Sequence, residues 1–516
     1  MKLSRTHYLI AMALVIAAYV AIRCWDLTAS CLWFDEIFGV HSAEHSWDTI
    51  LQFVALDLIH PPLFYVLLKL WIAIGGESLF WLRVFPVVFS VLALVPFLAL
   101  CRELKLDRPT TLLALFFLAV NGALTKYSQE VRMYSILFCL SLFSIWLFVR
   151  YFNKGKNLIP LLIVNVLLVY THYFGWFVIG AEAAAILVFQ RIKWRGVVTM
   201  AAVTLAAFTP WIVAVWNAAR SGSAVGQNIG WMERPGIKAI IQFKLALIEP
   251  FYQALSSVDA ASVYLVSIPL LLIFTVAIVM YAVEWGARDS DQKQNVYLLA
   301  IFAAMPVLAA LAASWTLPYS IWGTRHLIVV FAPVSILLAV MAASVSNRAA
   351  RTSLISLILL LTGSAFVVQA RRDQPQFIWC AWEKVADDFI DAANKPPFKP
   401  LYVFEDLIAY HFWFELRNYD EFYSVSVIKG VDGVDEDPAY FLPRGFSNVK
   451  TVRVDEITEN RVWIAFRGPP TSTDFGVSPP APVRALEDAG YEREKVNEFD
   501  MGGQTAYLVQ MAKRRD

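Results

Sequence analysis

The runs Trp-Phe-Asp-Glu at residues 33–36 and Asp-Leu-Ile-His-Pro-Pro-Leu at residues 57–63 decide the fold prediction. They place Asp35, Glu36, Asp57 and His60 in the first polar loop of a chain whose other segments are mostly apolar enough to lie in a membrane. Carboxylates and an imidazole at a membrane surface contribute little to anchoring, whereas they can move protons or bind a cation. This loop therefore carries most of the functional information in the sequence.

The composition indicates a membrane protein with many spans. Of 516 residues, 58% are hydrophobic and only 16% are charged, which is far from the balance of a soluble domain. The net charge is +1, and no basic run is long enough to follow a nucleic-acid backbone. Nucleic acid is therefore excluded as a partner.

The spacing of apolar segments predicts about eleven transmembrane helices, each roughly 16 to 22 residues long. Basic turns between them place the N-terminus in the cytoplasm and the C-terminus outside. The first segment is expected to be retained rather than cleaved as a signal peptide. The predicted spans are residues 8–24, 82–100, 110–125, 134–149, 158–173, 174–190, 197–216, 262–283, 296–315, 326–345 and 353–370.

Two further segments lie close to the membrane. Residues 61–75 are apolar but reach only about 22 Å as a helix, so they predict a re-entrant or juxtamembrane helix entered at Pro61. The outer loop 217–261 contains an amphipathic stretch, which favours a helix at the interface or over a cavity; a plain connector is the alternative.

With this topology, unusual polar residues gather on the outer side. Besides the acidic loop at 23–61, they are Arg83, Glu130, Arg132, His172, Arg325 and His326. From residue 371 to 516 the chain turns polar and predicts a small extracytoplasmic α/β domain, separate from the transmembrane domain 1–370. Its strand-like runs are 400–404, 423–428, 462–466 and 505–511, and its helix-like runs are 382–393 and 483–490. Of five cysteines, only Cys24 and Cys31 have a spacing that allows a disulfide, and free thiols remain the alternative for this pair.

Several of these motifs, taken in order and spacing, resemble a known family. Phe-Asp-Glu at 34–36, Asp-Leu-Ile-His-Pro-Pro-Leu at 57–63 and Leu-Arg-Val-Phe-Pro at 82–86 look like the signature of the GT-C membrane glycosyltransferases. The resemblance is closest to the protein O-mannosyltransferase-like family and its bacterial aminoarabinose-transferase relatives. Ser-Gln-Glu-Val-Arg-Met-Tyr-Ser at 128–135 and Arg-His-Leu at 325–327 extend it over about residues 1–345.

The resemblance implies transfer of a sugar from a polyprenyl-phosphate donor to an acceptor on the outer face of the bacterial inner membrane, with inversion. Asp35 matches the catalytic acidic position and is expected to act as general base, with Glu36 orienting its surroundings. The departing phosphate needs fixed cations, for which the candidates are Arg325, Arg132, Arg83 and His60. The acceptor is a protein, a lipid or a glycan, presenting a hydroxyl or a phosphate.

Each candidate also has a structural alternative. Asp35 and Glu36 could form an exposed turn, and Asp57 could cap the helix that follows. The arginines could extend to lipid head groups, Glu130 could belong to a surface cluster, and His172 could be an interfacial aromatic-belt residue. Oxygens of Asp35 and Glu36 with His60 could hold a divalent cation. A single lipid phosphate does not demand one, so no obligatory metal is expected.

Two other classes of protein compete with the transferase. A secondary transporter or lipid flippase could use the same outer-face charges to relay protons, but the charges lie at span ends and no sequence repeat is visible. An assembly subunit could keep the fold without catalysis, and the intact Asp35-Glu36 pair argues against it.

Overall fold

A computed structural model shows the chain as two compact units, each considered by itself below. The helical unit comprises Met1–Leu27 and Ser46–Asp373, and the α/β unit comprises Thr28–His45 and Gln374–Asp516. The acidic segment 28–45 thus clusters with the C-terminal part of the chain. The structure describes residues 4–189, 194–220, 225, 229–230, 232–251, 263–371, 380–393, 399–419, 421–434, 449–469, 475, 478–501 and 504–514.

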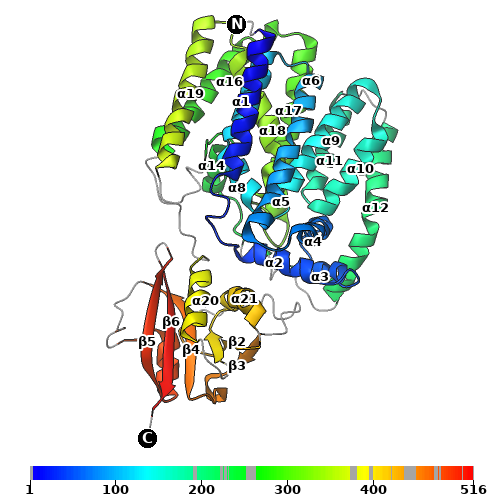
Figure 1. The fold of residues 1–516 in the computed structure, drawn as a ribbon. Coiled ribbons are helices and arrows are strands. Elements are labelled where there is room, and N and C mark those ends of the chain that lie inside the picture. Colours follow the sequence, from blue (N-terminus) through cyan, green and yellow to red (C-terminus); the bar gives the residue numbers. More distant parts are fainter. Residues whose placement is uncertain are drawn as a thin grey trace. The chain divides into compact units, whose positions relative to one another are not determined.

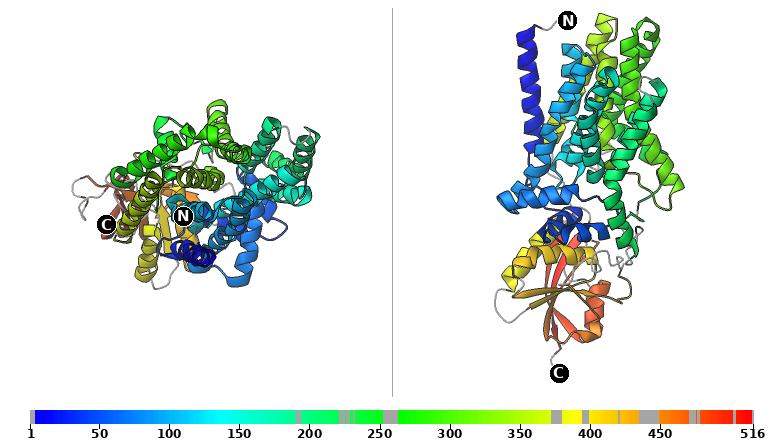
Figure 2. Two further views of the ribbon diagram at one scale, coloured as in Figure 1. Left: turned by 90° about the horizontal axis from the view of Figure 1, so that it is seen from above. Right: turned by 90° about the vertical axis from the view of Figure 1, so that its right-hand side faces the viewer.

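The helical unit is a bundle of long apolar helices running side by side (Figures 1 and 2). Among the described residues, eight helices or joined helix pairs are long and apolar enough to cross a membrane. They are α1 (Arg5–Cys24), α5 with α6 (Leu79–Leu92 and Leu94–Glu103), α9 (Tyr134–Lys154), α12 (Trp194–Arg220), α16 (Ile268–Val283) after the π-helix η1 (Val263–Ser267), α17 (Ser290–Thr316), η3 with α18 (His326–Val330 and Phe331–Ala343) and α19 (Arg348–Ala370).

Shorter helices complete the bundle. Three of them, α7 (Arg108–Val120), α10 (Leu158–Thr171) and α11 (Gly175–Phe189), coincide with predicted spans, so every predicted span corresponds to a helix. The predicted short helix after Pro61 is α4 (Leu63–Gly75); its relation to the membrane stays a prediction. The loop 217–261 contains α14 (Ile237–Ala246), and part of that loop lies outside the described residues. Other short helices among the described residues of this unit are α3 (Ile50–Leu56), α8 (Gly122–Gln129) and η2 (Trp285–Ala287).

A buried arginine that the sequence did not single out joins three helices. Arg23, near the end of α1, donates from Nε to Ser90 Oγ of α5 at 2.9 Å. Its two terminal nitrogens each donate at 3.2 Å to the carbonyls of Ala119 and Leu118, which end α7. These carbonyls have no partner within their own helix, and a cation there also complements the helix dipole. Arg23 therefore fixes α1 against α5 and α7.

A ring of three buried polar side chains joins α9, α10 and α11. Ser144 Oγ lies 2.8 Å from Asn165 Oδ1 and 2.6 Å from Glu182 Oε1, and the Asn165 amide donates to Glu182 Oε2 at 2.7 Å. Ser144 has one proton, so it can donate to only one of the two oxygens. All three bonds form if Glu182 is protonated and donates to Ser144. The ring therefore ties α9, α10 and α11 together through buried polar side chains.

The α/β unit contains one six-stranded sheet of order β3-β2-β1-β4-β6-β5. Strands β3 (Lys450–Val452), β2 (Tyr423–Ile428), β1 (Lys399–Val403) and β4 (Arg461–Gly468) are parallel, and β6 (Thr505–Lys513) and β5 (Tyr491–Asp500) continue antiparallel. Its helices within the described residues are α2 (Phe34–Glu44), α20 (Cys380–Ala392), α21 (Asp406–Leu416) and α22 (Ala481–Asp488), with 3-10 turns η4 (Arg417–Tyr419) and η6 (Val454–Glu456). A core of buried residues from β1, β4, β6 and α22 fills one face of the sheet.

The predicted α/β elements are confirmed, but the sequence missed three others. Strand β5, Tyr-Glu-Arg-Glu-Lys-Val-Asn-Glu-Phe-Asp, is an edge strand with few apolar positions, so its period-two signal is weak. Strand β3 is only three residues long, and α21 is apolar nearly all round, without a helical stripe.

The disulfide that the sequence spacing allowed, Cys24–Cys31, does not form. Cys31 is bonded to Cys380, at the first residue of α20, and Cys24 is free. The two bonded cysteines lie 349 residues apart in the sequence, and only the fold brings them together. Spacing in the sequence pointed to Cys24 because it lies close to Cys31, and spacing carries no information about contacts between distant residues.

The buried histidine His411 is expected to make a contribution to the stability of the α/β unit that is lost as the pH falls. Burial lowers the pKa of His411, on α21, to about 3, against an ordinary value of 6.5. Between these values the unfolded chain binds a proton that the folded unit does not, so this histidine lowers the free energy of unfolding by up to roughly 5 kcal/mol. Burial, and after it the charge of the nearby Glu383, raises the pKa of Glu415 to about 7. Between pH 7 and 4.5 the folded unit therefore binds a proton on Glu415 that the unfolded chain does not, and this raises the free energy of unfolding as the pH falls.

The difference between the wild type and His411→Gln isolates the histidine contribution. Pulsed hydrogen exchange of the sheet amides in urea, from pH 7 to pH 4, should show a shallower loss of stability in the variant. Equal pH slopes for the two proteins would contradict this assignment.

Candidate functional site

The centre of the candidate site is a chain of three buried side chains in the helical unit. His60 Nδ1 lies 2.5 Å from Asp57 Oδ2, and Arg132 Nη2 lies 3.2 Å from His60 Nε2. Arginine can only donate, so His60 Nε2 must accept, and the neutral ring carries its proton on Nδ1 and donates it to Asp57. Asp57 thereby fixes the tautomer of His60, and His60 fixes the direction of the Arg132 guanidinium.

The local sequence explains these positions. Asp57 ends α3, and the next residue, Leu58, has a positive φ of 62°. Pro61 and Pro62 then lead into α4. The chain therefore turns sharply between the two helices, and His60 faces back toward Asp57. Arg132 lies in the short connection between α8 and α9. The alternative in which Asp57 caps the following helix is not what the structure shows, because the N-cap of α4 is Pro62, no side chain caps that helix, and Asp57 bonds to His60.

Two further histidines join His60 to form an imidazole cluster, defined as His60, His172 and His326. The ring centroids of His60 and His172 are 6.0 Å apart, and those of His172 and His326 are 5.2 Å apart. The Phe174 amide donates to His172 Nδ1 at 3.1 Å, so a neutral His172 carries its proton on Nε2. His326 Nδ1 donates to the Ile321 carbonyl at 3.2 Å, which leaves its Nε2 as an acceptor.

Burial and the neighbouring charges disfavour a positive charge on His172. His172 lies in the connection between α10 and α11, where burial first, and then the nearby His326, His60, Arg132 and Arg325, lower its pKa well below the usual value. A cationic imidazole would face two guanidinium groups at short range. The cluster therefore offers neutral donors and acceptors beside fixed positive charge.

The remaining cations lie around the same end of the bundle. Arg325 is half-buried and lies close enough to Tyr127 to affect its ionisation. Burial and the neighbouring Glu130 raise the pKa of Tyr127, and the positive charge of Arg325 lowers it in part. Arg83 is buried in α5, and its Nη1 donates to the Gln129 carbonyl at the end of α8. The structure thus brings His60, Arg132, His172, His326 and Arg325 together, and it places Arg83 against the α8 terminus.

Asp35 and Glu36 belong to the α/β unit, in the first turn of α2. Glu36 is buried, and its Oε2 accepts a hydrogen bond from the backbone N–H of Trp33 at 2.9 Å, which satisfies a donor at the helix start. Asp35 is half-buried, in a turn where the helix dipole favours negative charge. The two acidic neighbours therefore differ in their surroundings: Glu36 is buried and closes the helix end, and Asp35 is half-buried in the same turn.

Metal-ligand clusters are absent from the residues that the structure describes, where no group of three or more His, Cys, Asp or Glu side chains is placed to hold an ion. Asp57 and His60 are already joined to each other, and His60 Nε2 is occupied by Arg132.

No protein-family model and no curated protein sequence matches the chain. Solved structures do match. ArnT from Cupriavidus metallidurans bound to undecaprenyl phosphate has a TM-score of 0.60 at 11% identity over 98% of both chains, and apo ArnT has 0.55 at 12% over 97% of both. AglB from Archaeoglobus fulgidus, in complex with an inhibitory peptide and a dolichol-phosphate, has a TM-score of 0.45 at 15% identity. The chain spans only 63% of the length of AglB.

At these identities the similarity to ArnT shows the fold. ArnT is a GT-C glycosyltransferase that matches this chain from end to end, including the C-terminal unit. The predicted GT-C fold, a polytopic helical membrane protein with a C-terminal α/β unit, is confirmed.

Proposed function

We propose that the chain is an inverting glycosyltransferase that uses a polyprenyl-phosphate-linked sugar as donor. The acceptor is a hydroxyl or phosphate group at the outer face of the bacterial cytoplasmic membrane. The strongest support is the hydrogen-bonded series Asp57–His60–Arg132. It holds the Arg132 guanidinium in a fixed orientation at one end of a helical bundle that has the fold of ArnT. ArnT binds undecaprenyl phosphate, which has one phosphate and a long apolar tail.

The reaction divides between two groups of residues. Asp35 accepts the proton of the acceptor hydroxyl as its oxygen attacks the anomeric carbon. The bond between that carbon and the donor phosphate oxygen breaks, and the polyprenyl phosphate leaves with its negative charge. Arg132 and Arg325 stabilise this charge, because a guanidinium pairs with phosphate through two parallel hydrogen bonds.

The other candidates take supporting roles. His60 orients Arg132, and Asp57 orients His60; His172 Nε2 supplies a neutral donor to the same region. Arg83 and Glu130 position the connection between α8 and α9, and Glu36 shapes the first turn of α2. The arginines neutralise a single phosphate, so we propose that no metal is obligatory.

The proposed extracytoplasmic placement has support within the α/β unit. The Cys31–Cys380 disulfide lies there, and disulfides persist in oxidising compartments such as the periplasm. The proposal requires residues 35 and 325 to face the same side of the membrane. Labelling of Asp35→Cys and Arg325→Cys variants with a membrane-impermeant thiol reagent in intact cells tests this, and labelling from opposite sides would contradict it.

The direct test is a mass comparison of envelope glycolipids, polysaccharides and glycoproteins from cells with and without the chain. We expect one class to lose the mass of a defined sugar residue, and re-expression to restore it. A flippase would instead change the sidedness of a lipid-linked sugar without the purified chain transferring it. Unchanged masses in all classes would contradict the proposal.

A further inference from the structure

A disulfide just before the helix that carries Asp35 attaches that helix to the C-terminal part of the α/β unit. Cys31, just before α2, is bonded to Cys380, the first residue of α20. The Cys31 backbone N–H also donates to Cys380 Sγ at 3.2 Å. Residues 28–45 consequently cluster with the C-terminal part of the chain, although the sequence places them directly after α1.

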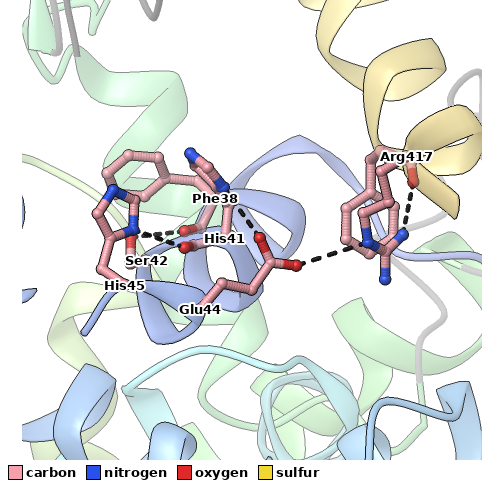
Figure 3. Close-up of polar contacts among 7 residues, drawn as sticks. Phe38, His41, Ser42, Glu44, His45 and Arg417 are labelled. Atoms are coloured by element: carbon pink, nitrogen blue, oxygen red, sulfur yellow. Dashed lines mark hydrogen bonds and ion pairs between the residues drawn. The ribbon is translucent and has the colours of Figure 1, made fainter. Parts of the chain in front are cut away.

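The other end of α2 is held by a cation from the same unit. Glu44, the last residue of α2, places Oε2 3.2 Å from His41 Nδ1 and Oε1 3.5 Å from Arg417 Nε (Figure 3). Arg417 follows α21 directly; its guanidinium lies 3.7 Å from the centroid of the Phe414 ring and donates to the Phe414 carbonyl. The cation therefore satisfies the end of α21 and reaches Glu44 from there.

Aromatic contacts connect the middle of α2 to α21. The His41 ring packs edge-on to Trp413 with centroids 4.6 Å apart, and Phe34 packs edge-on to Tyr410 at 5.6 Å. The residues of α2 from Glu36 to Ala43 are buried. The helix is thus fixed at both ends and along its length by parts of the chain more than 300 residues away.

We propose that the α/β unit is the part of the enzyme that positions the catalytic base, with Cys31, Cys380 and Arg417 as positioning residues for Asp35. The inference rests on the proposed function. The disulfide has the larger effect, because the Arg417–Glu44 pair is partly exposed and such pairs contribute little. A displacement of about 1 Å at a reacting group can cost a hundredfold in rate, so loosening α2 should slow the reaction without unfolding the chain.

The same attachment makes the activity sensitive to thiols. A dithiol such as dithiothreitol reduces the Cys31–Cys380 bond to two thiols, becoming a cyclic disulfide itself, and releases one end of α2. Exchange with a disulfide oxidant such as oxidised glutathione, which is itself reduced to two thiols, restores the bond. The effect requires no change in the helical unit, where Asp57, His60 and Arg132 lie.

The test uses the full chain and the double variant Cys31→Ser, Cys380→Ser, with Cys24→Ser as the matched control because Cys24 is a free, exposed cysteine. In cells lacking the chain, we expect the double variant to form about ten- to a hundredfold less glycosylated product by mass spectrometry. Cys24→Ser should equal the wild type. Hydrogen exchange of amides 34–44 should be faster in the double variant, and binding of undecaprenyl phosphate to the purified protein should change less than twofold.

Two further measurements separate positioning from misfolding and from failure of the proposed function. Dithiothreitol should lower the activity of the wild type reversibly and leave the double variant unchanged. Arg417→Lys should retain most of the product that Arg417→Ala loses. Full activity of the double variant, while Asp35→Asn is inactive, would overturn this inference and leave the proposed function intact; an active Asp35→Asn would overturn the proposed function itself.

Discussion

Asp35→Asn is expected to abolish glycosyl transfer, lowering product by at least about a hundredfold, while the protein still inserts and binds donor lipid. The substitution keeps the size and shape of the side chain, but an amide cannot accept the proton that the acceptor hydroxyl must lose. General-base catalysis typically contributes about 10²- to 10⁴-fold to a rate. Product is measured by mass spectrometry in cells that lack the wild-type chain, and donor binding by retention of undecaprenyl phosphate on the purified variant.

The neighbouring carboxylate supplies a matched control. Glu36→Gln removes the same charge one residue away, but the amide oxygen can still accept the Trp33 backbone hydrogen bond that Glu36 makes. We therefore expect Glu36→Gln to keep most of the activity and Glu36→Ala to lose part of it with the helix end. Equal losses in Asp35→Asn and Glu36→Gln would show that the acidic turn acts through its charge alone, and normal turnover by Asp35→Asn would refute the assignment of the base.

The helices of the fold were predictable because lipid imposes a local requirement. A span needs about 20 apolar residues in succession, so each span is visible in its own stretch of sequence, such as 353–370. The polar exceptions within these stretches carry no such local signal. In the sequence, Arg23 is only a basic residue near the end of a predicted helix. The fold shows that its guanidinium donates hydrogen bonds to the carbonyls of Leu118 and Ala119.

The sequence predicted which residues belong to the candidate site, but it did not predict the hydrogen bonds between them. Motif spacing singled out His60 and Arg132, yet their contact spans 72 residues of sequence, and the tautomer of His60 follows only from the atoms on its two sides. The division of labour between Asp35 and Glu36 also depends on one backbone hydrogen bond. The attachment of α2 to Cys380 and Arg417 gave no signal in the sequence, because neither partner lies near a motif.

Arg132→Met is expected to have the second-largest effect, with transfer reduced about a hundredfold or more and binding of undecaprenyl phosphate weakened about tenfold. Removing one preorganised donor from a site of developing negative charge commonly costs about 10²- to 10³-fold in rate. The loss should be greater in rate than in binding, because the charge on the phosphate grows as the sugar departs. Lys126→Met is the matched control, since it removes a positive charge from the end of α8 whose ammonium lies 5.7 Å from the Tyr127 ring centroid.

Asp57→Asn tests whether Arg132 acts in a fixed direction. An asparagine can either accept from or donate to His60 Nδ1, so the ring can also take the tautomer with a proton on Nε2, which opposes the Arg132 donor at 3.2 Å. We expect a loss smaller than that of Arg132→Met, with undecaprenyl phosphate binding nearly unchanged, because the cation remains but is less well oriented. If Lys126→Met and Arg132→Met reduced binding and transfer alike, net charge would explain the result; if Arg132→Met left transfer unchanged, the donor phosphate would have to bind elsewhere.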